Sequence, residues 1–518
     1  MTSLARAVLA LALGGLALLP ALVLLGQALP VLGQGGWLAH FASTTLPHQA
    51  LASLAVAAEA VAVALAAGAV PAVAVARYEF SGRRVVTALA LLPLLLSPSV
   101  AATTWTVVYA HEFFVSGHAL ALQHGLSASP YVFVIFRVAA TRMPRAFGEL
   151  AASLGLGILG RIWRVHLPLL AVPAAASAVI VGALAVGDYA AAERLGVPTL
   201  SVGILNLWLS TQSVTVAAIV STVVAVPAVL AVAVAAWAAT SLMSQNPVTA
   251  AAAAAGRRRI APLWGAGIVA WTLLAAMPGF FAPEAQLVRW AIERWSRTRF
   301  EAIPGDVANT LVTALGTTAL VALAIALVVL VMRSGHRSRW AERLPWLFLT
   351  NFFLPTLVLA LAFVMMTSDA SWLGRWLGDW RDTRWMIAVP EALRLMPFAM
   401  LPVLDAMRRT PPAMVEAARA FGAGPVAARL TAYAGHVAPA WLLGCALVFM
   451  EAIKALDAAL TLQPFGFSSL ALKIYAFSRH QNMDRAAIWV LLSQALMLLP
   501  WLLLWWRLDR LDARRGPA

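Results

Sequence analysis

The chain has 518 residues, of which 62% are hydrophobic and only 11% are charged. A soluble globular protein carries about 25% charged residues, so this composition excludes a fold whose whole surface faces water and predicts a membrane protein. The net charge of +15 would also suit a nucleic-acid-binding protein, but in a membrane chain the arginines are better explained as cytoplasmic topology signals.

The first half of the chain contains six apolar stretches that predict membrane-spanning helices. About 30 Å of hydrocarbon needs roughly 20 helical residues at 1.5 Å rise. Such stretches lie at 5–29, 49–76, 86–109, 126–141, 167–187 and 213–242. The stretch at 126–141 is short and contains Arg137. The first stretch has Arg6 ahead of its apolar core, as a secretory signal does. No clear small-residue cleavage site follows, however, and this favours a resident helix.

The second half repeats this arrangement, with apolar stretches near 262–282, 305–332, 346–367, 384–407, 437–460 and 485–506. We therefore predict an all-α polytopic membrane protein of about 12 transmembrane helices, built as two pseudo-symmetric six-helix halves. The halves are 1–243 (core 47–242) and 263–518 (core 305–507). The low-complexity segment 244–262 is predicted to join them as a cytoplasmic linker.

Arginine clusters predict which side of the membrane each loop faces, because cytoplasmic loops carry an excess of basic residues. With both termini in the cytoplasm, the inner clusters are those at 77–84, 142–164, 257–259, 333–343 and 408–429. Two arginine-containing segments, 289–300 and 372–385, fall on the outer side and break this rule. Both are Trp-rich and amphipathic, which is typical of segments that lie flat at the membrane interface as aromatic anchors.

One polar segment occurs twice, each time between the fourth and fifth spans of its half. Residues 142–168 read RMPRAFGELAASLGLGILGRIWRVHLP, and residues 409–424 read RTPPAMVEAARAFGAG. The offset between the copies is constant, since 416 − 149 = 267 and 422 − 155 = 267. In each copy a proline stops one helix, a short helix of small residues follows, and a glycine gives a sharp exit. Two equivalent docking helices suit a partner that has two equivalent faces.

The first copy resembles the "EAA" coupling loop of binding-protein-dependent ABC importer permeases. The matching residues are Glu149, Ala151, Gly155, Val165, Leu167 and Pro168, with Leu150 where the family usually has Ala. The second copy keeps Glu416, Ala417, Ala418 and Gly422, but shows Ala434 and Gly435 instead of Leu-Pro, with a proline only at Pro439. The resemblance implies that each short helix inserts into an ATP-hydrolysing subunit and transmits its closure to the pore. Because Leu-Pro is missing from the second copy, the resemblance does not determine where the second short helix ends.

Two further segments resemble the two-domain permeases of ferric-iron importers. They read GDYAAAERLGVPTLSVGI (187–204) and LDAALTLQPFGFSSLALKI (456–474), and NTL at 309–311 adds to the resemblance. This implies an inner-membrane permease for ferric iron, surrounded by lipid and served by two copies of an ABC ATPase subunit. A periplasmic solute-binding protein is expected to deliver the cargo to outer loops, among them 187–212 and 461–484. Relatives of this architecture carry thiamine, polyamines or phosphonates, which are the alternative cargoes.

The chain itself shows no catalytic motif. No Walker A sequence exists, because neither Lys454 nor Lys473 is preceded by Gly or followed by Ser or Thr. We therefore expect a transport subunit that is not an enzyme and binds no cofactor, with ATP and Mg²⁺ on the partner ATPase. Nine scattered histidines favour helix-end roles over a metal site. The single Cys445 excludes an internal disulfide.

Ionisable residues inside predicted spans are costly and are usually paired or functional. Glu451, Lys454 and Asp457 stand at i, i+3 and i+6, which predicts mutual neutralisation along one helix face. Glu391 and Arg394 form another i, i+3 pair. Neutralisation inside the helix bundle is therefore the favoured interpretation of these charges.

Glu59 and Arg137 lack local partners and are expected to meet across helices. The sharper alternative is that Glu59, Glu451 or Asp457 lines a polar path for a cation. Prolines within the spans recur in both halves and predict helix kinks, with gating hinges as the alternative: Pro93, Pro98, Pro355 and Pro397.

Two rival classes of protein follow from the same features. A secondary active transporter also has internal repeats and twelve spans, but matched cytoplasmic loops favour the ABC permease; dependence on ATP or on an ion gradient separates the two. A membrane-embedded enzyme would need a cluster of His or acidic residues at one membrane depth, which the sequence does not show.

Overall fold

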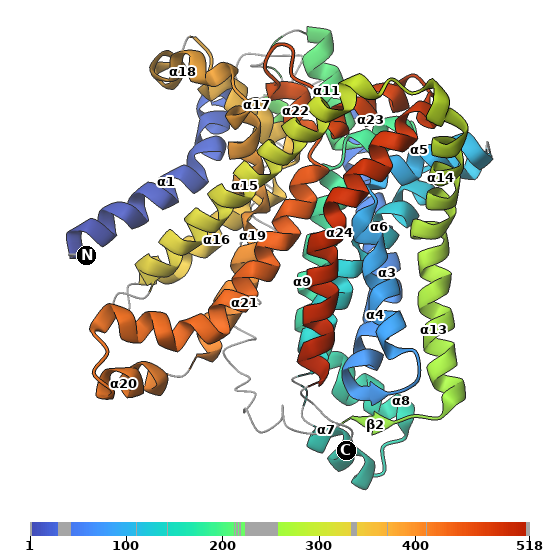
Figure 1. Ribbon diagram of the computed structural model, residues 1–518, viewed down its shortest axis with the longest axis vertical. Helices are drawn as coiled ribbons and strands as arrows, with labels where there is room; N and C mark the ends of the chain where they lie inside the picture. The colour runs from blue at the N-terminus through green and yellow to red at the C-terminus, as the bar shows by residue number, and fades with distance from the viewer. Residues whose placement is uncertain are drawn as a thin grey trace.

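The computed structural model describes residues 3–29, 43–109, 111–141, 143, 145–211, 213, 216, 219–222, 257–332, 339–369, 371–410 and 412–513. Most of the predicted sixth span and of the predicted linker therefore lies outside the described residues. The rest forms an all-α polytopic membrane protein, whose long helices run between two opposite ends of the molecule (Figure 1).

The described elements of the first half are α1 (Ser3–Ala28), α3 (Thr45–Arg77), β1 (Tyr78–Glu79), α4 (Arg83–Leu91), η1 (Leu92–Leu95), α5 (Pro98–Tyr109), η2 (Glu112–Val115), α6 (Gly117–Ala140), α7 (Arg145–Ser153), α8 (Ile158–Arg161), η3 (Ile162–His166), α9 (Leu167–Gly187), α10 (Ala190–Arg194) and α11 (Leu200–Thr211). Those of the second half are β2 (Arg258–Arg259), α13 (Pro262–Ala276), η5 (Met277–Phe281), α14 (Ala282–Arg294), η6 (Trp295–Arg297), η7 (Phe300–Ala302), α15 (Ile303–Met332), α16 (Arg339–Phe353), α17 (Thr356–Met366), α18 (Trp372–Leu377), η8 (Gly378–Asp382), α19 (Trp385–Arg409), α20 (Pro412–Ala420), α21 (Pro425–Ile453), α22 (Asp457–Leu462), α23 (Leu470–Arg479) and α24 (Met483–Ala513).

The predicted spans agree with these helices in place but not always in length. Among the described residues, 8 helices are long and apolar enough to cross a membrane, or up to 10 if each of two bent pairs is one span. The short span predicted at 126–141 is wrong in its start, because α6 begins at Gly117. Gln123 and His124 lower the hydropathy there, yet both are buried inside the protein. The span predicted at 437–460 is also too long, because α21 ends at Ile453.

Two predicted spans are broken rather than straight. The span at 86–109 bends by 86° between Leu95 and Pro98, and the span at 346–367 bends by 103° between Phe353 and Thr356. Pro98 opens α5 and Pro355 precedes α17. Proline lacks the backbone N–H and disfavours helix at the residue before it, which explains why both breaks occur at these positions.

The helix packing shows two equivalent halves. In the first half α3, α6 and α9 pack against one another, and in the second half α15, α19 and α21 do the same. The pairs α5–α10 and α17–α22 are a further match. Tyr131 of α6 and Phe398 of α19 stand 267 positions apart, the same offset as in the repeated segment, and their ring centroids are 5.1 Å apart. The two halves therefore meet at this aromatic pair.

The first helix of each half packs against the other half. The helix α1 contacts α15, α16 and α17, whereas α13 contacts α3 and α4. Asn351 Nδ2 donates to the Ala17 carbonyl at 2.8 Å, and Trp271 Nε1 donates to the Ala66 carbonyl at 3.0 Å. This exchange ties the halves together within the membrane-spanning region.

A short parallel pair of strands also connects the two halves. The sequence pattern predicted only helices, so these strands were not expected. Tyr78 pairs with Arg258 and Glu79 with Arg259, near the end of the predicted linker 244–262. The Glu79 carboxylate lies 3.2 Å from Arg83 and 3.5 Å from Arg257. Two of the predicted inner arginine clusters therefore lie at the same end of the molecule.

Glycines allow the closest helix contacts. A Cβ added at Gly68 of α3 would lie 2.5 Å from the Ser129 carbonyl oxygen, and one at Gly444 would lie 2.4 Å from Ala399 Cα. Small residues at such positions let helix backbones approach closely in a bilayer. The Gly/Ala-rich α3 thus serves as a packing surface for α6.

We expect Gly68→Ala to lower the free energy of unfolding by about 1–3 kcal/mol, because the new methyl group meets backbone that cannot move away. Denaturant unfolding of the purified protein in detergent measures this. Gly182→Ala is the matched control, since nothing lies within 4 Å of its added Cβ. Equal stability of Gly68→Ala and the wild type would contradict the close α3–α6 contact.

Candidate functional site

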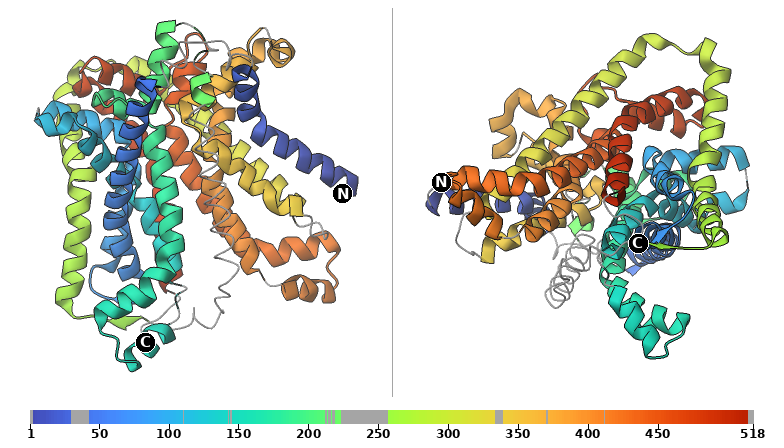
Figure 2. Two further views of the ribbon diagram at one scale, coloured as in Figure 1. Left: turned by 180° about the vertical axis from the view of Figure 1, so that it is seen from behind. Right: turned by 60° about the horizontal axis from the view of Figure 1, so that its bottom comes forward.

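The two copies of the repeated segment fold into two short helices, α7 and α20, at the same end of the molecule. Figures 1 and 2 show both helices at the end opposite α18 and α22. Arg142, Pro144 and Pro411, which precede the helices, lie outside the described residues. The structure therefore brings the two predicted docking segments to one side of the molecule, as expected for two halves of the same topology.

Both short helices end in the same hydrogen-bonded cap. In α7, Gly155 N donates to the Ala152 carbonyl and Leu156 N donates to the Ala151 carbonyl, both at 3.0 Å. In α20, Gly422 N donates to the Arg419 carbonyl at 2.9 Å and Ala423 N donates to the Ala418 carbonyl at 3.1 Å. This is the pattern of a Schellman motif. The second helix thus ends as the first does, although Leu-Pro is missing after it.

The cap requires glycine at one position in each copy. Gly155 has φ +80° and Gly422 has φ +86°, the left-handed region that other residues reach at a cost of roughly 1–2 kcal/mol. Nothing lies within 4 Å of a Cβ built on either glycine. The constraint is therefore conformational and local, and a side chain there would project into open space.

The surfaces of both short helices combine exposed acidic and apolar side chains. Glu149 and Glu416 are exposed. Leu154 at the end of α7 is 72% exposed, and Phe421 at the end of α20 is 91% exposed. Ala151 is buried and Ala418 is half-buried, whereas Ala417 is exposed. Large exposed apolar groups beside a charge are typical of a surface that a partner protein covers.

The two copies differ after the cap. In the first copy α8 and a π-helical turn, η3, lead to α9, which has Pro168 in its first turn. In the second copy α21 continues without interruption from Pro425 to Ile453 and includes Ala434, Gly435 and Pro439. The missing Leu-Pro therefore changes the path of the chain beyond the cap.

A polar network joins the halves at the far end of α21. The Glu451 carboxylate accepts hydrogen bonds from the Tyr131 hydroxyl of the first half and from Lys454 Nζ, the latter at 2.5 Å. Lys454 Nζ also donates to the Leu94 carbonyl at 3.3 Å, beside the break in the first half's third span. The predicted pairing of Glu451 with Lys454 is confirmed, and it extends across the two halves.

Asp457 does not belong to the same helix face as Glu451 and Lys454, so this part of the prediction is wrong. The helix ends at Ile453, and Asp457 opens a new helix, α22. Asp457 instead interacts electrostatically with Arg394. Asp188, its counterpart in the first half, does the same. The predicted Glu391–Arg394 pair is present at 3.5 Å, with Glu391 fully buried.

The predicted meeting of Glu59 and Arg137 is wrong. Glu59 pairs with His118 at 2.8 Å, and its side chain is 44% exposed. Arg137 Nη2 donates to the Leu508 carbonyl at 2.9 Å. His118 and Arg137 stand 19 positions apart on α6, which separates them by about 28 Å. Glu59 is also remote from Glu451, because Tyr131, the partner of Glu451, lies about 20 Å along α6 from His118.

A second polar cluster connects α10 of the first half with α23 of the second, at the end of the molecule opposite α7 and α20. The Tyr475 hydroxyl donates to Glu193 Oε2 at 2.8 Å and lies 3.4 Å from the Tyr189 hydroxyl. Burial raises the pKa of Tyr475 to about 12 and also raises the pKa of Tyr189, so both phenols keep their protons at neutral pH. Sequence reasoning missed this cluster, because its members lie far apart in the chain.

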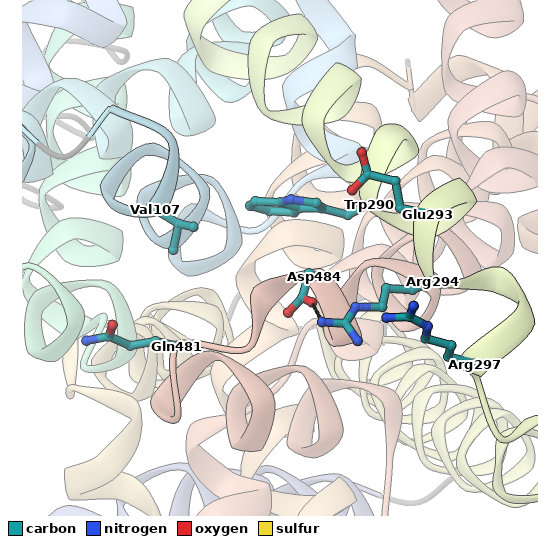
Figure 3. Close-up of a pocket in the computed structure, with 7 residues that line it drawn as sticks. All are labelled: Val107, Trp290, Glu293, Arg294, Arg297, Gln481 and Asp484. Carbon is teal, nitrogen blue, oxygen red and sulfur yellow. Dashed lines mark ion pairs between the residues drawn. The ribbon is translucent and has the colours of Figure 1, made fainter.

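Two cavities among the described residues lie near these polar groups. One, of about 520 Å³, is shown in Figure 3 and is lined by Val107, Trp290, Glu293, Arg294, Arg297, Gln481 and Asp484. An Arg294–Asp484 ion pair crosses it and ties α14 to α24. The other, of about 40 Å³, lies between the halves and is lined in part by Ser97, Ser99, Lys454, Tyr475 and Ser478. The described residues contain no group of three or more His, Cys, Asp or Glu that could hold a metal ion.

Comparison with known families bears on the second half. Residues 320–514 match the model of the family described as "Binding-protein-dependent transport system inner membrane component". The match runs from within α15 to the end of the described chain and includes α20. It supports a permease of an ABC importer, and permeases of this family work with ABC ATPases and binding proteins. No curated protein matched the chain.

We expect Glu451→Gln to lower the free energy of unfolding by about 3–5 kcal/mol, because it leaves the Lys454 ammonium buried without its counter-charge. The double variant Glu451→Gln/Lys454→Met should be more stable than Glu451→Gln alone. Denaturant unfolding in detergent measures both.

Asp369→Asn serves as the control, since Asp369 forms an exposed pair with Arg381 and its loss should leave stability unchanged. If Glu451→Gln unfolds as the wild type does, the network between the halves does not stabilise the fold.

Proposed function

We propose that this chain is the fused, two-half membrane subunit of an ATP-driven ABC importer. The observation that carries the proposal is the pair of short helices with identical glycine caps at one end of two equivalent halves. The family match over 320–514 supports the same class independently. The proposed location is the bacterial inner membrane, with α7, α20 and both chain termini on the cytoplasmic side.

In this proposal two copies of an ABC ATPase subunit dock on α7 and α20. Glu149, Gly155, Glu416 and Gly422 supply the charged anchors and the sharp turns, while Leu154 and Phe421 offer apolar surface. ATP and Mg²⁺ bind to those partners and no cofactor binds to this chain. Closure of the ATPase pair would bring α7 and α20 together.

The motion of α20 has a direct path to the opposite end of the protein. The helix α20 packs on α21, and α21 is a continuous helix of 29 residues, about 43 Å long. Its last turn carries Glu451 and leads to Lys454, the residues that bind Tyr131 and Leu94 of the first half. Displacement of α20 therefore acts on the contacts of Glu451 and Lys454 with the first half.

Ferric iron is the proposed cargo, delivered by a periplasmic solute-binding protein. Support comes from the resemblance of 187–204, 456–474 and 309–311 to ferric-iron permeases. In the structure these segments occupy equivalent places: Leu200 N donates to Ser53 Oγ, and Leu470 N donates to Thr310 Oγ1, both at 2.9 Å. Thiamine, a polyamine or a phosphonate is the alternative cargo.

We expect Gly155→Val and Gly422→Val to abolish co-purification of the ATPase subunit while membrane insertion is unchanged. A β-branched residue cannot adopt the left-handed turn without strain, yet no neighbour blocks folding. Pull-down of the tagged chain measures the first effect and membrane fractionation the second. Gly182→Ala, in the interior of α9, is the control; a double variant that retains the full complex and its uptake would refute docking on these helices.

We expect cells that contain this chain to take up labelled ferric iron in a manner that needs both ATP and the binding protein. The comparison is between cells with and without the chain, before and after ATP depletion and after collapse of the ion gradient. Uptake that follows the ion gradient would instead identify a secondary transporter. If the cells take up no iron but take up thiamine, a polyamine or a phosphonate in an ATP-dependent manner, the chain belongs to an ABC importer with that compound as its substrate.

A further inference from the structure

Three hard oxygen donors from the two halves converge at the outer end of the protein. Tyr189 and Glu193 belong to the first half, and Tyr475 belongs to the second. The Tyr475 hydroxyl lies 2.8 Å from Glu193 Oε2 and 3.4 Å from the Tyr189 hydroxyl. Glu193 lies one helical turn after Tyr189, since the Glu193 backbone N donates to the Tyr189 carbonyl at 2.8 Å. The three oxygens thus form a small triangle that exists only when the halves are together.

The three residues of this triangle are partly shielded from solvent but can still be reached by a ligand. Tyr189 is only 2% exposed, while Tyr475 and Glu193 are partly exposed. Tyr475 also lines the cavity of about 40 Å³ between the halves, next to the hydroxyls of Ser97 and Ser478. A space of that size holds at least one water molecule. A ligand at the triangle would therefore contact the boundary between the halves on one side and the outer surface on the other.

The chemistry of the donors selects the kind of ligand. Phenolate and carboxylate oxygens are hard, anionic donors that suit hard, highly charged cations, and tyrosinate is an established ligand of iron in proteins. Two oxygens at right angles around an ion with bonds of about 2.0 Å lie about 2.8 Å apart. The Tyr475 oxygen lies 2.8 Å from the Glu193 oxygen and 3.4 Å from the Tyr189 oxygen, which is close to this oxygen–oxygen distance.

We propose that Tyr189, Glu193 and Tyr475 form a transfer site for a hard trivalent cation, ferric iron being the example, at the outer mouth of the permease. The inference rests on the proposed importer and specifies where its cargo first contacts this chain. On binding, each phenol releases its proton to water and the carboxylate binds as the anion. Water or the anion that accompanies the metal completes the coordination.

The positive charges near the site fit transfer rather than storage. Arg194 interacts with Glu193, and Arg479 interacts with Tyr475. Both guanidinium groups repel a cation and weaken its binding. A site on a transport path must bind strongly enough to admit the ion and weakly enough to release it. A separation of the halves would also pull Tyr475 away from Tyr189 and Glu193, which would dismantle the site.

The test is a spectroscopic titration of the purified chain in detergent with ferric nitrilotriacetate. Iron bound by phenolate gives a visible charge-transfer band, which the chelate alone lacks. We expect the band in the wild type and its loss in Tyr189→Phe and in Tyr475→Phe. Tyr109→Phe is the matched control, because Tyr109 stacks on Phe114 at the end of α5 and should leave the band unchanged.

Each outcome is decisive for the site. A wild type without the band, or a band that survives in both Tyr189→Phe and Tyr475→Phe, overturns the proposal and leaves the triangle as a hydrogen-bonded contact between the halves. Size-exclusion chromatography shows whether the variants are folded, and Glu193→Gln, which keeps the side-chain shape, should weaken the band. If ATP-dependent iron uptake occurs but the wild type shows no band, the proposed transfer site is wrong and the proposed importer function stands. A band without iron uptake would keep the site and overturn ferric iron as the cargo.

Discussion

The break in the third span of the first half creates a requirement that the rest of the structure meets. Lipid cannot hydrogen-bond the backbone groups that a broken helix releases, so protein must do so. The second half supplies the donors: Lys454 Nζ bonds the Leu94 carbonyl, and Trp501 Nε1 bonds the Leu91 carbonyl at 2.9 Å. Lys454 in turn needs Glu451, which also binds Tyr131. The break, the buried charges and the contact between the halves therefore depend on one another.

The fold is duplicated, but the buried charges are not. When the halves are aligned on Asp188 and Asp457, Gly182 takes the place of Glu451 and Ala185 the place of Lys454. On α6, positions 124 and 127 correspond by the same 267 offset to Glu391 and Arg394, and they hold His and Ser. Fusion of the halves into one chain permits this difference, because each half can change separately. The second half thus provides the charged side of the central boundary.

The sequence predicted those features that are encoded locally. Hydropathy located the spans, and the spacing of Glu149, Gly155, Glu416 and Gly422 predicted the capped helices, because a left-handed turn after a short helix selects glycine. Pro98 and Pro355 indicated the breaks, although not their angles. Contacts between distant segments left no local signal. The exchange of α1 and α13, the partner of Glu59, and the meeting of Tyr189 with Tyr475 follow from packing of halves whose relative placement no spacing reveals.

The unequal connections beyond the two caps make the halves mechanically different. The helix α21 extends as one element from the cap to Ile453, although it contains Pro439 and bends along its course (Figure 1). The π-helical turn η3 between α7 and α9 is a place where a helix can bend or change register, and such turns often occur at functional positions. In the proposed importer, ATPase subunits docked on α7 and α20 would therefore act on the membrane helices through two different connections. Equal displacements of the two short helices would then move the two halves by different amounts.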